Sequence, residues 1–235
     1  MDMMKKTLAE SLPGLGLALP DSIQDQLCAF GHAMVKQNEV MNLTGITEDD
    51  QVAKLHLIDS LTVLKCADLK GKTLIDVGCG AGFPGVPTAI ACPGAKVTLL
   101  DSLAKRMNWL ETVLPQLGVE NAECVTARAE EAIVDRRESY DYATSRAVAR
   151  LNILLELTAP YVKVGGAVLA LKGSAAREEL EEAKSAISKL GLQVESVKDF
   201  TVDKDTVHTV IVLRKVRPTP AKFPRRYAKI KQAPL

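Results

Sequence analysis

The spacing of apolar residues along the chain changes near residue 70. Before that point they recur at helical spacing, at Ile23, Leu27, Phe30, Met34 and Met41. Asp21 precedes this run and can cap its first turn. Thr47 and Asp50 resemble a capping box ahead of a second helical face, formed by Val52, Leu55, Ile58 and Leu61. Residues 1–68 are therefore predicted to form a helical cap.

From residue 73 onward, short apolar runs alternate with helical patterns. The predicted strands are Leu74–Val77, Lys96–Leu100, Ala122–Thr126, Tyr140–Thr144 and Ala167–Leu171. The predicted helices span about 85–91, 103–117, 147–160 and 174–190. Strands that alternate with helices indicate a parallel sheet with right-handed crossovers.

Two more strands, Gln193–Phe200 and Val207–Lys215, follow each other across the polar turn Asp203-Lys204-Asp205 without a helix between them. One of them must therefore run antiparallel to the rest. The expected fold is an α/β fold with a doubly wound, seven-stranded, mostly parallel sheet. It would form a domain over residues 69–216, between the helical cap and a tail over 217–235.

Composition agrees with a folded protein that contains one large domain. The chain has 235 residues, of which 47% are apolar and 25% charged, close to the average of globular proteins. Apolar runs stay short of the roughly 18 residues that would cross a bilayer. We therefore expect a cytoplasmic protein that does not bind membranes.

Cysteine and histidine give no sign of a metal site. The five cysteines are scattered without a C-x-x-C pair, which argues against disulfides and structural zinc. His32, His56 and His208 lie far apart in the sequence and lack the spacing of metal ligands. No metal is expected.

The net charge of +1 hides an uneven distribution along the chain. From Arg214 to Leu235 there are eight basic residues and no acidic ones, which leaves the preceding residues with a charge of about −7. This tail is predicted to be an extended arm along the phosphates of a polyanion, with Phe223 or Tyr227 stacked on a base. A solvated, disordered end is the alternative. The predicted RNA contacts in the tail are Lys222, Arg225 and Arg226.

A glycine-rich loop directly follows the first predicted strand, in the segment Asp76-Val77-Gly78-Cys79-Gly80-Ala81-Gly82-Phe83-Pro84-Gly85. Glycines at a strand-to-helix turn let a ligand approach the backbone amides. Asp101 ends the next strand, 21 residues after Gly80, where a carboxylate can bind ribose hydroxyls. This spacing suits NAD as well as other cofactors that carry adenosine. Asp101 can also simply cap the helix that starts near Ser102.

Asp76 favours one of these cofactors. An acid at the end of this strand would crowd the pyrophosphate of a dinucleotide, but it suits a cofactor with a cationic amino-acid tail. S-adenosylmethionine has such a tail and carries no phosphate. A glycine turn without any ligand is the remaining alternative.

Three further strand ends carry candidate residues, because ligands of open α/β sheets lie over the carboxyl ends of the strands. We expect adenine to bind near Ala129 and Glu130. Arg146 can hold a phosphate of the substrate or the carboxylate of the cofactor, or form a surface ion pair. Lys172 allows the same interpretations and is counted among the candidate RNA contacts.

Taken together and in order, seven segments resemble the bacterial 16S ribosomal RNA guanine-N7 methyltransferases, the glucose-inhibited division B family. They are Asn42–Thr44, His56–Leu61, Asp76–Gly85, Asp101–Arg106, Arg128–Glu130, Ser145–Ala147 and Leu171–Gly173. The resemblance implies a class I, Rossmann-like methyltransferase fold and S-adenosylmethionine as cofactor, contacted at Gly78, Phe83, Ala129, Glu130 and Arg146. Asp76, Gly80, Gly82 and Asp101, from the glycine loop and the next strand end, complete the predicted cofactor site. The resemblance also implies a guanine in the decoding region of 16S RNA as substrate, in free RNA or in the 30S subunit, and a monomer is expected.

The chain departs from that family at two positions. Cys79 stands where serine or threonine is usual, and Leu55 stands where a basic residue usually precedes the histidine, here His56.

Guanine N7 has an exposed lone pair, so its methylation needs no general base and no covalent nucleophile. Arg146 is therefore expected to position the reactants. The alternatives are a nicotinamide-dependent oxidoreductase and a non-enzymatic ribosome assembly factor.

Overall fold

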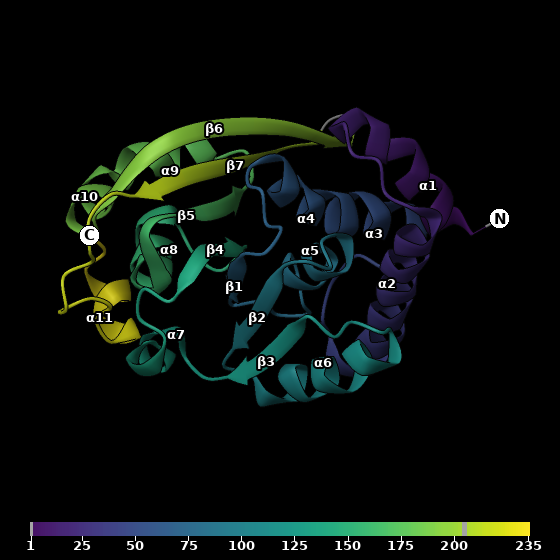
Figure 1. Ribbon diagram of the computed structural model, residues 1–235, viewed down its shortest axis with the longest axis horizontal. Coiled ribbons are helices and arrows are strands. Elements are labelled where there is room, and N and C mark those ends of the chain that lie inside the picture. The colour runs from purple at the N-terminus through teal and green to yellow at the C-terminus, as the bar shows by residue number, and fades with distance from the viewer. Residues whose placement is uncertain (1, 204–205) are drawn as a thin grey trace.

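Seven strands form one sheet in the computed structural model, which describes residues 2–203 and 206–235. The strands are β1 (Thr73–Val77), β2 (Lys96–Asp101), β3 (Ala122–Thr126), β4 (Tyr140–Arg146), β5 (Val162–Lys172), β6 (Leu192–Asp203) and β7 (Thr206–Lys215). Their order in the sheet is β3-β2-β1-β4-β5-β7-β6 (Figure 1). The predicted doubly wound, seven-stranded sheet is confirmed.

The antiparallel strand is β7, which lies between β5 and β6 and pairs antiparallel with both. The other neighbouring strands pair in parallel. Of the predicted turn between β6 and β7, residues 204–205 lie outside the described residues. Strand β5 begins five residues earlier than predicted, and Val162 pairs with Tyr140 ahead of a register shift in β4.

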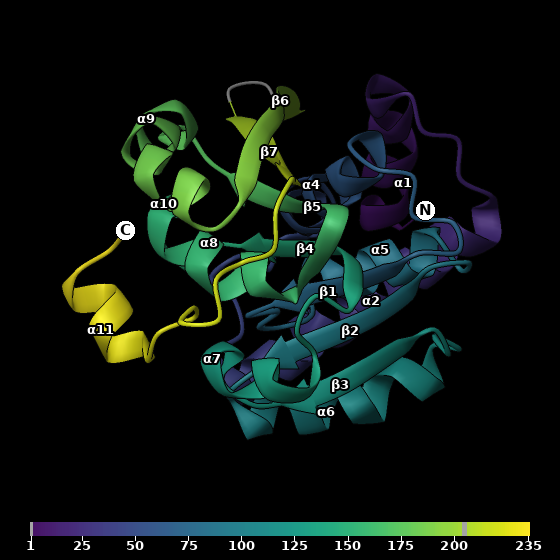
Figure 2. The same ribbon diagram turned by 60° about the vertical axis from the view of Figure 1, so that its left-hand side comes forward.

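Helices cover both faces of the sheet (Figures 1 and 2). The first face carries α1 (Met3–Ser11), α2 (Asp21–Met41), α5 (Gly85–Ala91) and α6 (Ala104–Gln116). The second face carries α8 (Leu151–Thr158), α9 (Ala176–Glu182) and α10 (Lys184–Lys189). Alternate side chains of β1 serve the two layers, because Leu74 packs into the first and Ile75 and Val77 into the second.

Two predicted helices differ from the structure. The helix expected over 147–160 begins only at Leu151, because Ala147 has a φ of +56°, in the left-handed region that a helix cannot use. It continues into the 3₁₀ turn η5 (Ala159–Tyr161). The helix expected over 174–190 is divided into α9 and α10 at Ala183.

The N-terminal cap is helical, as predicted, but its helices start differently. Residue Asp21 is the first residue of α2, after Pro20, so it does not cap the helix. Helix α3 (Asp49–Val52) starts after Glu48, and no side chain caps it, so the predicted capping box of Thr47 and Asp50 is wrong by one residue. The chain continues through η2 (Ala53–Ile58), α4 (Asp59–Leu61) and η3 (Thr62–Lys65).

The sequence analysis missed α1 and the short turn η1 (Leu12–Leu15) after it. Side chains of the cap, such as Met4, Leu27 and Phe30, belong to the same buried cluster as residues of β1 and β2. The domain boundary at residue 68 stays a prediction. None of the helices among the described residues is both long and apolar enough to cross a membrane.

The tail is not an extended arm. Phe223 is only 4% exposed and Ile230 is buried, and both belong to the core of the second face. A helix, α11 (Tyr227–Gln232), follows near α7 (Ala129–Ala132) and its 3₁₀ extension η4 (Ile133–Asp135) (Figure 2). The prediction that Phe223 stacks on a base is therefore wrong, because packing against the domain covers its ring.

Candidate functional site

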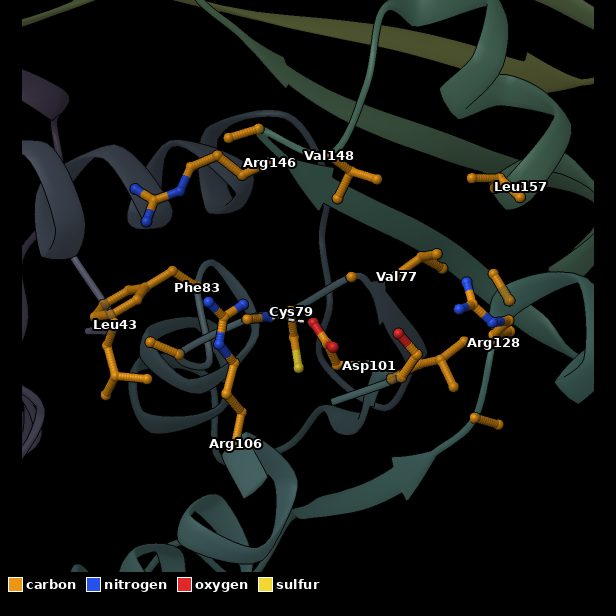
Figure 3. A pocket seen from close by; sticks show the side chains of 18 of the residues that line it. Leu43, Val77, Cys79, Phe83, Asp101, Arg106, Arg128, Arg146, Val148 and Leu157 are labelled. Atoms are coloured by element: carbon orange, nitrogen blue, oxygen red, sulfur yellow. Dashed lines mark hydrogen bonds between the residues drawn. The ribbon is translucent and has the colours of Figure 1, made fainter. Parts of the chain in front are cut away.

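A cavity of about 540 Å³ opens at the carboxyl ends of β1, β2, β3 and β4 (Figure 3). Of the predicted cofactor residues it is lined by Gly78, Gly80, Phe83, Asp101, Ala129, Glu130 and Arg146. These residues come from four segments that parallel strand order brings to one edge of the sheet. The predicted location of the site therefore agrees with the structure, while the contacts with a cofactor stay predictions.

The glycine loop brings bare backbone to the cavity. The amides of Gly78 and Cys79 both donate to the carbonyl oxygen of Leu100, at 2.7 and 3.1 Å, which ties the loop to β2. Gly78 has a φ of +73°, and a Cβ there would lie 2.5 Å from a methyl of Val148. Only glycine fits this position, because both the backbone conformation and the approach of Val148 exclude a side chain.

Asp76 lies beneath the loop and does not line the cavity. Its side chain is fully buried, and Oδ2 accepts a hydrogen bond from the amide of Gly85 at 2.7 Å. Oδ1 has no hydrogen-bond partner among the described residues. Burial raises the pKa of this carboxyl to about 7. In this structure Asp76 thus holds the start of α5 through the amide of Gly85. Its predicted contact with the cofactor's amino-acid tail stays a prediction.

Gly82 also turns away from the cavity. A Cβ at this position would lie 2.7 Å from Val86 and 3.0 Å from Leu110. Gly82 therefore permits close packing between the loop and the helices of the first face. Its predicted role in cofactor binding stays a prediction beside this structural one.

Asp101 lines the cavity and organises the backbone around it. Oδ2 accepts a hydrogen bond from the amide of Gly80 at 3.0 Å, and Oδ1 accepts one from Leu103 at 2.9 Å. Asp101 holds the turn before α6 but does not cap that helix, whose N-cap is Leu103. It also faces the cavity, and its contact with ribose stays a prediction (Figure 3). Carboxylate oxygens have further lone pairs, so ribose hydroxyls can still donate to them.

Ala129 and Glu130 border the other end of the cavity, next to the tail. The hydroxyl of Tyr161 donates to the carbonyl oxygen of Ala129 at 2.5 Å. The amide of Tyr227 donates to Glu130 at 3.3 Å, and Tyr227 itself lines the cavity. Tyr227 was not predicted to belong to this site, because the C-terminal tail was expected to be extended.

Arg146 does not point its guanidinium freely into the cavity. Nη1 donates to the carbonyl oxygen of Leu55 at 2.8 Å and to Oδ2 of Asp59 at 2.9 Å. Asp59 is 1% exposed and its Oδ1 also accepts from Nδ1 of His208 at 2.6 Å. Burial opposes ionisation of Asp59, but the hydrogen bonds from His208 and Arg146 outweigh it and lower its pKa. Arg146 therefore faces a carboxylate of the protein itself.

His56 completes this network and is neutral. Burial, and then the charge of Arg146, lowers its pKa to about 4. Its Nδ1 lies 3.2 Å from Nη2 of Arg146 and must accept, so Nε2 carries the proton and donates to Oγ1 of Thr44 at 2.9 Å. The ring stacks on Phe83 with centroids 4.9 Å apart. His56 thus links the N-terminal cap to the cavity wall.

Two of the four predicted RNA contacts are occupied within the protein. Lys172 pairs with Glu179 at 2.8 Å and its side chain is 7% exposed. Arg225 donates to Glu156 through its backbone amide, Nε and Nη2, and Glu156 is fully buried. These contacts oppose the predicted phosphate contacts of both residues. Lys222 and Arg226 are exposed.

Two basic residues at the cavity were missed. Arg106 and Arg128 line it and lie on the side away from Arg146 and Val148 (Figure 3). The sequence shows Arg106 only as one of two cations at a helix start. Its position beside Gly80, with Nη1 3.6 Å from where a Cβ would lie, depends on the tertiary fold.

Comparisons with known proteins agree with this site. A family model described as rRNA small subunit methyltransferase G matches residues 23–208. The chain is 42% identical over 226 residues to ribosomal RNA small subunit methyltransferase G of Alkaliphilus metalliredigens, which covers 94% of this chain and 95% of the relative. It is also 42% identical over 235 residues to the protein of that name from Acetivibrio thermocellus, covering 99% of this chain and 97% of the relative.

Solved structures resemble the fold at lower identity. TYW2 of M. jannaschii in complex with AdoMet has a TM-score of 0.56 at 14% identity, covering 68% of this chain and 76% of that one. A SAM-dependent methyltransferase from Aquifex aeolicus has a TM-score of 0.54 at 20% identity, covering 69% of this chain and 92% of that one. The sequence matches cover most of the chain at 42% identity and therefore show the family as well as the fold. The chain belongs to the rRNA small subunit methyltransferase G family.

Proposed function

We propose that this protein is an S-adenosylmethionine-dependent methyltransferase that methylates N7 of a guanine in the decoding region of 16S ribosomal RNA. The observation that carries the proposal is the cavity at the carboxyl ends of β1, β2 and β3, built from the glycine loop, Asp101 and Glu130 in a chain of this family. The oxidoreductase alternative has no comparable support. We further propose that the enzyme acts on the 30S subunit in the cytoplasm and that it is a monomer.

The residues of the cavity suit S-adenosylmethionine. Asp101 offers acceptors to ribose hydroxyls, and the bare backbone of Gly78 and Gly80 leaves room for the amino-acid tail. Ala129 and Glu130 would border the adenine. When bound, the cofactor supplies an electrophilic methyl group on a sulfonium. Arg106 and Arg128 are candidates for the cofactor's carboxylate or for RNA phosphates.

The wall of the cavity near Arg146 suits a cationic cofactor electrostatically. The charge of Arg146 is balanced by Asp59, and His56 is an uncharged imidazole. An imidazolium at that place would repel a sulfonium at close range. We assign positioning roles to Arg146 and His56, because attack by the lone pair of guanine N7 needs no proton transfer beforehand.

The test is methylation of 30S subunits from cells that lack the endogenous enzyme, with methyl-labelled S-adenosylmethionine. Borohydride reduction and aniline cleavage then reveal 7-methylguanine. One cleavage in the decoding region is the expected result. Label without cleavage would remove N7 as the acceptor. RNA binding without label, unaffected by Gly78→Ala, would favour the assembly factor.

A further inference from the structure

A second cavity, of about 560 Å³, lies beside the first, over the carboxyl ends of β4 and β5. His56, Arg146, Ala147 and Val148 line both cavities, so the two cavities adjoin along these residues. Figure 3 shows Arg146 and Val148 at the edge of the first cavity. A third cavity, around Cys92, shares no lining residue with the first.

Methyl transfer in a single displacement requires that the acceptor atom lie about 3–3.5 Å from the carbon attacked. The acceptor base must therefore occupy space that adjoins the cofactor cavity. The second cavity meets this condition because it adjoins the first along their shared lining residues, and the third does not. The volume of the second cavity is also large enough for a purine.

The second cavity combines apolar surfaces with a few polar groups. Ile46, Leu55 and Leu171 offer apolar contacts to the faces of an aromatic base. Among the titratable residues in its lining, Asp59, His56 and Arg146 are bound to one another or to backbone. Two others, Glu179 and His208, each keep an acceptor atom without a partner among the described residues.

Glu179 is the stronger acceptor of the two. Oε2 takes both of its contacts, from Lys172 at 2.8 Å and from the amide of Leu151 at 2.7 Å. These contacts fix the carboxylate at the edge of the cavity, where its side chain is 14% exposed. Oε1 is thus available to accept a hydrogen bond from a ligand.

His208 presents its second nitrogen to the same space. Nδ1 is held by the carboxylate of Asp59 at 2.6 Å, which orients the ring and leaves Nε2 as the atom without a partner among the described residues. The His208 side chain is 26% exposed and lines the cavity. A neutral imidazole that donates through Nδ1 accepts at Nε2.

We propose that the second cavity binds the target guanine, with N7 toward the cofactor cavity and the opposite N1–H and 2-amino edge toward Glu179 and His208. This inference rests on the proposed function. Two acceptors suit guanine, whose N1 and exocyclic nitrogen both donate. They oppose adenine, whose N1 would place a lone pair against the carboxylate. Asp59 acts on the base only through His208 and is a positioning residue.

The first test exchanges one atom at Glu179. In Glu179→Gln the side-chain carbonyl can keep the bonds to Lys172 and Leu151, while the amide turns a donor toward the donors of the base. We expect kcat/KM for unmethylated 30S subunits to fall about tenfold or more, with the Kd for S-adenosylhomocysteine within about twofold. Glu178→Gln is the control, because Glu178 is exposed and does not line the cavity.

The second test fills the cavity. Gly173 lines only the second cavity, and a Cβ there meets no atom within 4 Å, so Gly173→Phe adds a ring without backbone strain. We expect methyl transfer to fall about 100-fold or more, with unchanged affinity for S-adenosylhomocysteine and an unchanged melting temperature. Gly14→Phe is the control, since Gly14 has equal space and lies outside both cavities.

A fully active Gly173→Phe enzyme would overturn the proposed base site. A parallel loss of cofactor affinity in Gly173→Phe would also overturn it, because the second cavity would then belong to the cofactor. A fully active Glu179→Gln enzyme would overturn the contact with the base. Failure of the proposed function would look different, because the wild-type protein itself would form no 7-methylguanine.

Discussion

Two buried groups beside the glycine loop carry pKa shifts with opposite effects on stability. The pKa of His56 is lowered to about 4 and that of Asp76 is raised to about 7, in both cases chiefly by burial. As pH falls toward 5, His56 gains a proton in the unfolded chain but not in the native protein, which favours unfolding. As pH rises toward 7, Asp76 is ionised in the unfolded chain but resists ionisation in the native protein, which also favours unfolding. Their contributions nearly cancel between pH 5 and 7 in the wild-type protein.

His56→Gln should reveal one half of this balance. The unfolded chain binds a proton at this residue near pH 6.5 and the native protein only near pH 4, so His56 makes the native state less stable as pH falls through this window. Between pH 7 and 5 the wild-type protein should lose about 2 kcal/mol relative to the variant. Urea unfolding at both pH values measures this difference, and a constant difference would contradict it.

Asp76→Asn should reveal the other half. The native carboxyl keeps its proton up to about pH 7, whereas the unfolded one loses it near pH 3.8, so Asp76 lowers stability as pH rises. The asparagine carbonyl can still accept from the amide of Gly85. Relative to the wild type, the variant should gain about 2 kcal/mol between pH 5 and 7 in the same urea experiment. A stability difference between variant and wild type that stays constant over that range would show that the carboxyl is already ionised in the fold.

At the scale of elements, the strands were predictable because each is a short, buried apolar run between turn residues. The start of α8 was not, since a left-handed φ at Ala147 leaves no mark in an apolar pattern. Nor was the docking of the tail, because the partner of Arg225 is Glu156, 69 residues earlier in the chain. An isolated basic segment gives no sign of a buried acid elsewhere.

The same limit applies to the candidate site. The glycine loop and Asp101 were found because each motif is local and follows its own strand. The Arg146, Asp59 and His208 network was missed, since its contacts join residues 87 and 149 positions apart. Nothing in the sequence indicated that Lys172 has a partner, because the position of Glu179 beside it depends on where α9 begins.

Arg225 anchors the tail to the domain. Removing its side chain should show how much the position of the tail contributes to cofactor affinity. In Arg225→Ala the buried Glu156 loses the two hydrogen bonds from the guanidinium and keeps only the one from the backbone amide, which should destabilise the protein by about 3 kcal/mol. Because α11 carries Tyr227 at the cavity, the affinity for S-adenosylhomocysteine should fall as well. Calorimetry measures both effects.

Two comparisons make this test specific. Adding Glu156→Gln to Arg225→Ala should recover part of the stability, because the uncompensated buried charge is removed. Lys222→Ala changes an exposed cation of the same tail and should alter neither quantity appreciably. Equal effects of Lys222→Ala and Arg225→Ala would show that tail charge, and not the buried contact, is responsible.

At the scale of the whole molecule, exposed cations lie at both edges of the sheet. Exposed Arg226 directly precedes Tyr227, which borders the cavity at the carboxyl edge, whereas exposed Lys96 starts β2 at the amino edge. A substrate RNA that places a base in the cavities passes close to Arg226. Cations that neutralise phosphates release counterions, so their number is measurable from salt dependence.

The variant Arg226→Ala should therefore weaken RNA binding and reduce the slope of log K against log salt concentration by about 1. The variant Lys96→Ala removes the same charge at the opposite edge and should leave the slope unchanged. Filter binding to unmethylated 30S subunits over a salt series measures both. Because neither residue lines a cavity, cofactor affinity should be constant throughout. Equal slopes for the two variants would mean that RNA does not approach across the carboxyl edge, and the proposed orientation of the substrate would then fail.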